Sequence, residues 1–150
     1  MVGTIGQRLR RAAWGIAPLL LLGCGFEPEG DVPMSPPELY RSWWEKTESC
    51  SGLTGDFDRV RWYVVEGYGF DCPSGRCAGR WQADGRIILA GDWTGHEMVV
   101  RHEMLHALIR RSGHPEHEFK SLCRLTWDTW HESEGDAETP APAALRAMLD

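Results

Sequence analysis

Along residues 38–127 some segments have apolar positions at helical spacing and others have the pattern of strands, which predicts a mixture of helices and strands. Residues 38–49 carry three apolar side chains at helical spacing, after two prolines that favour a helix start. Residues 60–66 are β-branched and aromatic, as in a strand, and residues 80–82 and 86–90 are typical of the two arms of a hairpin. This order of elements predicts a small α+β domain, in which a β-sheet packs on helices.

The strongest helical pattern covers residues 92–112. Thr94 and Glu97 have the spacing of a capping box at its start, and Gly113 is typical of the residue just past a helix end. Pro115 favours the opening of a second helix that reaches about Trp127. A turn this short predicts that the second helix returns along the first.

The first of these helices carries His102-Glu103-Met104-Leu105-His106, an H-E-x-x-H motif. At about 100° per residue the two histidines lie on one face, about 40° apart and one turn apart in height. Both imidazoles can therefore bind one ion, and we expect Zn²⁺. Glu103 is rotated away from this pair, in a position to hold a water molecule as a general base.

The sequence does not decide which residue is the third metal ligand. His114 and His117 both lie at the start of the returning helix, and a later acid (Asp128, Glu132 or Glu134) is an alternative. The metzincin pattern requires Gly three residues and His six residues after the second histidine. Those positions hold Ile109 and Ser112, so this pattern is excluded.

The string HEMLHALI followed by GHPEHEF resembles the SprT-like metalloproteases over residues 98–125. The resemblance implies a third histidine at the opening of the next helix, for which His114 fits best. Phe119 matches the aromatic residue that follows, one position later than in the family pattern. It also implies a minimal zincin-like domain, with a small sheet packed on the H-E-x-x-H helix, and zinc-dependent hydrolysis of peptide bonds. By analogy with zincins, the strand at residues 86–90 is expected at the sheet edge, where an extended peptide substrate can pair with it.

A second hypothesis is a non-catalytic lipoprotein of the cell envelope that binds zinc or a partner on a degenerate protease scaffold. Glu103 separates the two hypotheses, because catalysis requires it and binding does not.

Residues 1–23 are typical of a signal peptide, with three arginines before a short apolar run. The ending Leu21-Leu22-Gly23-Cys24 resembles the lipobox of bacterial lipoproteins, which implies lipidation of Cys24 and cleavage before it. Residues 24–37 then form a lipidated flexible tether and residues 38–150 the metal-binding domain. Since Gly25 rather than Asp follows the cysteine, we expect an outer-membrane anchor that faces the periplasm.

The remaining four cysteines are an even number, which outside the cytoplasm indicates two disulfides. Cys72 and Cys77 are close enough in sequence to close one turn, which leaves Cys50 to pair with Cys123.

Charge excludes one class of partner. The chain has 16 basic and 22 acidic residues, and the first 23 residues hold three of the bases and no acid, so the remainder has a net charge of −9. Such a surface is unsuited to nucleic acid, and we expect a monomer that meets the membrane only through its lipid and acts on a protein or peptide.

Overall fold

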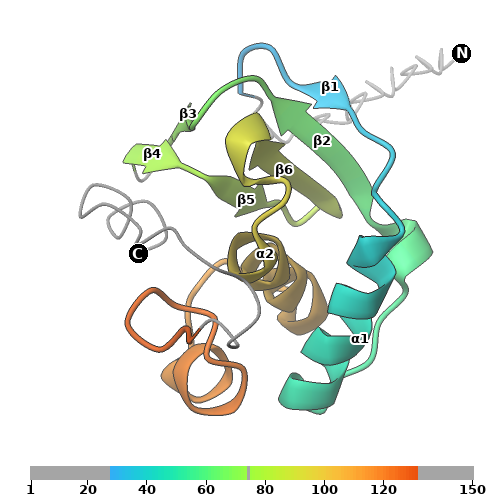
Figure 1. Ribbon diagram of the computed structural model, residues 1–150, viewed down its shortest axis with the longest axis vertical. Coiled ribbons are helices and arrows are strands. Elements are labelled where there is room, and N and C mark those ends of the chain that lie inside the picture. Colours follow the sequence, from blue (N-terminus) through green and yellow to red (C-terminus); the bar gives the residue numbers. More distant parts are fainter. Residues whose placement is uncertain (1–27, 74, 132–150) are drawn as a thin grey trace, which may run out of the picture.

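A computed structural model of the 150-residue chain describes residues 28–73 and 75–131 (Figure 1). The predicted signal peptide, Cys24 and the acids Glu132 and Glu134 lie outside the described residues. Within the described part, no helix has the length and apolar character to cross a membrane. The architecture is the expected α+β class, with one four-stranded and one two-stranded sheet.

The larger sheet has the order β1-β2-β6-β5, formed by β1 (Val32–Pro33), β2 (Arg61–Val65), β6 (Arg86–Ala90) and β5 (Gly79–Trp81). Strands β2 and β6 run parallel, and the other two pairs are antiparallel. Every residue of β6 is buried, which suits its Ile-Ile-Leu-Ala run and its central place. The second sheet is a hairpin of β3 (Phe70–Cys72) and β4 (Gly75–Cys77).

Three predictions about the sheet were wrong. The predicted edge strand at residues 86–90 is internal, and β5 is the terminal strand on that side. The predicted flexible tether includes β1, which pairs with β2, and the Met34 amide also donates to the Trp62 carbonyl at 2.9 Å. Residues 67–79, for which the sequence predicts a loop, contain the β3–β4 hairpin. Local patterns miss these features because short strands gain their stability from pairing partners elsewhere in the chain.

Helix α2 (Glu97–Ile109) packs against β5 and β6 of the large sheet and lies beside helix α1 (Leu39–Ser51), as Figure 1 shows. All residues from Met98 to His106 are buried, so α2 is a core helix with little solvent-facing surface. Two short 3₁₀ turns, η1 (Phe57–Arg59) and η2 (Gly91–Trp93), precede β2 and α2. The short π-helix η3 (His117–Leu122) packs on α1.

The ends of α2 differ from the prediction. Thr94 is not the N-cap, because its hydroxyl donates to the Gly91 carbonyl at 2.8 Å within η2. Glu97 instead pairs with Lys46 at 2.9 Å and with Arg101 at 3.0 Å. At the other end the helix stops at Ile109, because Arg110 takes a left-handed conformation with φ 55° and closes the helix in place of Gly113. The predicted second helix is correspondingly shorter and consists of η3.

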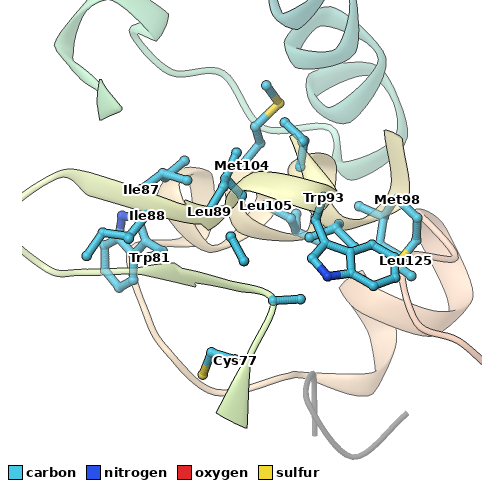
Figure 2. Close-up of a cluster of buried hydrophobic side chains, with 14 of the residues drawn as sticks. Cys77, Trp81, Ile87, Ile88, Leu89, Trp93, Met98, Met104, Leu105 and Leu125 are labelled. Atoms are coloured by element: carbon cyan, nitrogen blue, oxygen red, sulfur yellow. The ribbon is translucent and has the colours of Figure 1, made fainter. Parts of the chain in front are cut away.

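The core fills the space between the sheet and α2 (Figure 2). Ile87, Ile88 and Leu89 of β6 and Met104 and Leu105 of α2 belong to this core, and none of these five side chains is exposed. Burial of such side chains contributes about 1.5–3 kcal/mol each, which makes this layer the main source of stability.

Both predicted disulfides are present. Cys72–Cys77 closes the β3–β4 hairpin on itself. Cys50–Cys123 joins the end of α1 to the residue after η3, across a sequence separation of 73.

Candidate metal centre

Helix α2 brings two imidazoles of the H-E-x-x-H motif together. His102 and His106 lie one helical turn apart, and their Nε2 atoms are 3.3 Å from each other. The Nε2 atom of His114 lies 2.9 Å from that of His102 and 3.1 Å from that of His106. These three nitrogens form a group that can hold a metal ion.

Backbone carbonyls fix how two of these rings are protonated. The Nδ1 atom of His102 lies 2.7 Å from the Leu125 carbonyl oxygen, and Nδ1 of His106 lies 2.8 Å from that of Arg111. A carbonyl oxygen only accepts, so each Nδ1 must carry the proton, and each Nε2 of a neutral ring then presents a lone pair. Two lone pairs that face each other cannot form a hydrogen bond, whereas a shared cation satisfies both.

The pKa values agree with neutral ligands. Burial lowers the pKa of His102 well below its ordinary value, and the nearby His106 lowers it further. Burial likewise lowers the pKa of His106 to about 4, despite the opposing effect of its hydrogen bond to the Arg111 carbonyl. Both rings are therefore neutral at pH 7, which is the form that binds metals.

The early end of α2 explains how His114 reaches the pair. Because the left-handed Arg110 turns the chain away immediately after Ile109, the four residues 110–113 make the return to His114. The two helical histidines are buried and His114 is exposed, so the group opens toward solvent on one side.

The other candidate ligands lie elsewhere. His117 is exposed at the start of η3 and is not part of the group. Asp128 is also outside it, with its carboxylate 3.3 Å from the Lys120 ammonium.

Phe119 contacts all three imidazoles. Its ring centroid lies 4.8 Å from that of His102, 4.7 Å from that of His106 and 5.0 Å from that of His114. The side chain is fully buried. Phe119 thus forms an apolar wall that keeps water from this side of the group.

Glu103 is held by strand β5. Its carboxylate oxygen Oε2 accepts a hydrogen bond from the Trp81 amide at 2.6 Å, and the side chain is buried. Burial raises the pKa of Glu103 to about 8, although the Trp81 hydrogen bond and the charge of Arg80 act in the opposite direction. On the same strand, the Trp81 ring lies nearly parallel to that of His106, with centroids 6.4 Å apart.

Gly79 makes room for this carboxylate. A Cβ atom at position 79 would lie 2.8 Å from Glu103 Cγ and 2.9 Å from its Oε1, closer than real contacts allow. Sequence reasoning missed this residue, although a glycine within a strand is a known sign of close approach. It also missed the Trp81 amide and the carbonyls of Arg111 and Leu125, since backbone groups leave no trace in residue identity.

Searches for a matching protein family, for similar curated proteins and for similar solved structures each find no match.

Proposed function

We propose that the protein is a zinc-dependent metallopeptidase that hydrolyses peptide bonds in the cell envelope. The observation that carries the proposal is the convergence of three imidazole Nε2 atoms within 3.3 Å of one another, two of them on a helix that also carries the buried Glu103. The motif and its resemblance to SprT-like metalloproteases support the same activity.

Three nitrogen ligands suit zinc. Zn–N bonds of about 2.0–2.1 Å in a tetrahedron place ligand nitrogens about 3.4 Å apart, close to the separations of His102, His106 and His114. Three protein ligands are typical of catalytic zinc sites, which keep a fourth position for water or substrate. Zinc supplies Lewis acidity, which polarises a carbonyl group and makes water easier to deprotonate near neutral pH.

Glu103 supplies proton transfer. The buried Glu103 carboxylate directly follows the ligand His102 in the chain, and in this proposal it accepts a proton from water and passes it to the leaving amine. Its bond to the Trp81 amide fixes its orientation before a substrate arrives.

Strand β5 supplies the substrate-binding edge in this proposal. It is the terminal strand of the sheet and carries the Trp81 amide that binds Glu103. An extended peptide that pairs with β5 passes close to this carboxylate. This mode of binding favours unfolded or extended segments of proteins over compact ones.

The test compares zinc content with peptide cleavage in the full-length oxidised protein. The substitutions H102A, H106A and H114A should remove zinc and activity together. E103Q should keep zinc, because the ligands are untouched, and lose at least about 10²-fold in rate. H117A is the matched control and should keep both, since His117 lies outside the group.

Two results would decide against the enzyme. Full activity of E103Q would contradict the assigned proton transfer. One zinc per chain with no cleavage across a broad peptide library would favour the non-catalytic zinc-binding lipoprotein.

A further inference from the structure

The segment from His114 to Leu125 supplies one whole side of the metal centre. It contributes the third imidazole from His114, the apolar wall from Phe119 and the carbonyl of Leu125 that orients His102. The other side comes from α2. The geometry of the centre therefore depends on how this segment is held against the helices.

The covalent link that holds the segment is the Cys50–Cys123 disulfide, two residues before Leu125. The ion pairs of Lys120 in this segment are local, with Glu116 at 4.0 Å and with Asp128 at 3.3 Å. The segment also packs on α1 through η3, buries Phe119 and Leu125, and accepts a hydrogen bond from His102 Nδ1 at the Leu125 carbonyl, 2.7 Å away.

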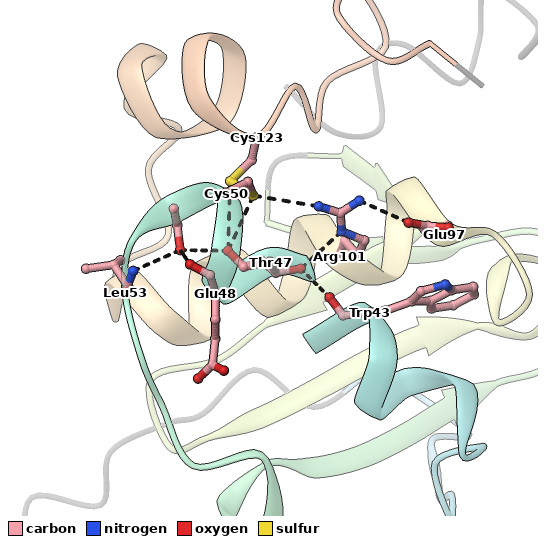
Figure 3. Close-up of a disulfide and its surroundings, with 9 residues drawn as sticks. Trp43, Thr47, Glu48, Cys50, Leu53, Glu97, Arg101 and Cys123 are labelled. Atoms are coloured by element: carbon pink, nitrogen blue, oxygen red, sulfur yellow. Dashed lines mark hydrogen bonds and ion pairs between the residues drawn. A yellow bond between two sulfur atoms is a disulfide. The ribbon is translucent and has the colours of Figure 1, made fainter. Parts of the chain in front are cut away.

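The same disulfide also contacts α2 beside the first metal ligand (Figure 3). Arg101 directly precedes His102, and its Nη2 atom lies 3.6 Å from the Cys50 sulfur. Its Nε donates to the Thr47 hydroxyl at 3.1 Å and its Nη1 to the Glu97 carboxylate at 3.0 Å. Through Arg101, one cross-link is connected to both sides of the metal centre.

We propose that Cys50 and Cys123 are positioning residues of the metal centre, so that the protein holds its metal tightly only after this disulfide has formed. The inference rests on the metal binding in the proposed function and adds a condition to it. A chain in a reducing compartment would have a weak metal site, and oxidation after export would complete it.

The oxidation is an ordinary thiol–disulfide exchange. The thiols of Cys50 and Cys123 together lose two electrons and two protons and form one S–S bond. The disulfide of a partner oxidoreductase, or a small molecule with a disulfide such as oxidised glutathione, takes up those electrons and protons. That disulfide thereby becomes two thiols. The partner is therefore of the disulfide-donating class.

Cys72–Cys77 provides a matched control within the same chain. It joins two strands of one hairpin and lies outside the segment from His114 to Leu125. Loss of this bond removes a disulfide equally but leaves the attachment of that segment unchanged.

The experiment measures the zinc dissociation constant of the full-length protein by competition with a chromophoric chelator. The pair C50S/C123S should raise the constant about 10–100-fold, the range seen when groups that orient metal ligands are lost. The pair C72S/C77S should change it less than about twofold. In that control background, reduction with a phosphine should weaken zinc binding, and reoxidation with oxidised glutathione should restore it.

Co²⁺ absorption spectra and far-ultraviolet circular dichroism distinguish positioning from general stability. We expect C50S/C123S to keep its secondary structure while the Co²⁺ spectrum changes. Unchanged zinc affinity would overturn the proposal, and so would loss of secondary structure, because the disulfide would then support the whole fold. Absence of zinc in the oxidised wild type would overturn the proposed function as well. This result differs from unchanged zinc affinity and from loss of secondary structure, which overturn only the role of the disulfide.

Discussion

At the scale of single residues, Gly79 leaves space for the Glu103 side chain, and filling that space tests the role of the Glu103 carboxylate. G79A places a Cβ atom 2.8 Å from Glu103 Cγ, so the carboxylate must leave the Trp81 amide. We expect zinc to remain bound, kcat/KM to fall at least about tenfold, and stability to drop by about 1–3 kcal/mol from overpacking.

Zinc analysis, peptide kinetics and thermal unfolding of G79A check these three expectations. G95A is the control, because a Cβ atom at position 95 meets nothing within 4 Å. Full activity of G79A would show that the bond between Glu103 and Trp81 is dispensable.

The raised pKa of Glu103 predicts how the stability of the metal-free protein depends on pH. Its pKa is about 8 in the folded chain, against a reference of 4.5. Between these values the folded state keeps a proton that the unfolded state has lost, so this group lowers the free energy of unfolding as pH rises. E103Q removes the effect and should gain stability relative to the wild type from pH 5 to pH 8, on the order of a few kcal/mol.

Urea unfolding in the presence of a chelator at several pH values measures the difference between E103Q and the wild type. The lowered pKa values of His102 and His106 act with the opposite sign, because they add stability as pH rises from the folded toward the ordinary histidine pKa. Both proteins share those histidines, so their effect largely cancels in the difference. A difference that does not change with pH would rule out the raised pKa of Glu103.

At the scale of elements, the end of α2 depends on one residue in a left-handed conformation. Arg110 has φ 55° and ψ 40°, a region that disfavours residues with a Cβ atom by about 1–2 kcal/mol. R110G should therefore stabilise the protein by roughly 0.5–1 kcal/mol, after allowance for the greater freedom of glycine in the unfolded chain. Zinc affinity should stay the same, because the amide of residue 110 still bonds the His106 carbonyl.

Thermal unfolding compares R110G with R111G, which serves as the control because Arg111 is not in the left-handed region. R111G should lose stability. If R110G also loses stability, the arginine side chain contributes more than its backbone strain costs.

The elements show which parts of the fold are predictable from sequence. Helix α1 and strands β2 and β6 follow their local hydrophobic patterns, because each buries one continuous apolar set. The start of α2 does not, because tertiary ion pairs take Glu97 away from a capping role. Capping rules use adjacent residues only, and they cannot anticipate Lys46, which lies 51 residues away.

The three-histidine group is likewise predictable from sequence only in part. The pairing of His102 with His106 follows from helical geometry alone, so the motif is sufficient to predict it. The choice between His114 and His117 depends on where α2 ends, and no propensity rule assigns that end to Arg110. Gly79 and Trp81 reach Glu103 only through the sheet order that places β5 next to α2.

At the scale of the whole molecule, β1 shortens the distance between the expected lipid anchor and the fold. The sheet begins at Val32, so seven residues separate it from Cys24, and a fully extended link of this length spans about 25–30 Å at most. If Cys24 is lipidated, as the resemblance of residues 21–24 to a lipobox predicts, the domain stays close to the membrane. C24A should then move the protein from the membrane fraction to the soluble fraction. Immunoblotting of separated fractions measures this, and unchanged membrane association of C24A would contradict the lipid anchor.

The carbonyls that orient His102 and His106 determine which residues of this site can change during evolution. Every amino acid has a carbonyl group, so the three-histidine group places no demand on the side chain at position 111, which is exposed. It does demand the path of the chain, because a shift of either carbonyl would turn an imidazole. Related proteins can therefore differ in most residues around the motif and still keep the spacing from His106 to His114. Comparison of backbone structures would then detect homology that comparison of sequences overlooks.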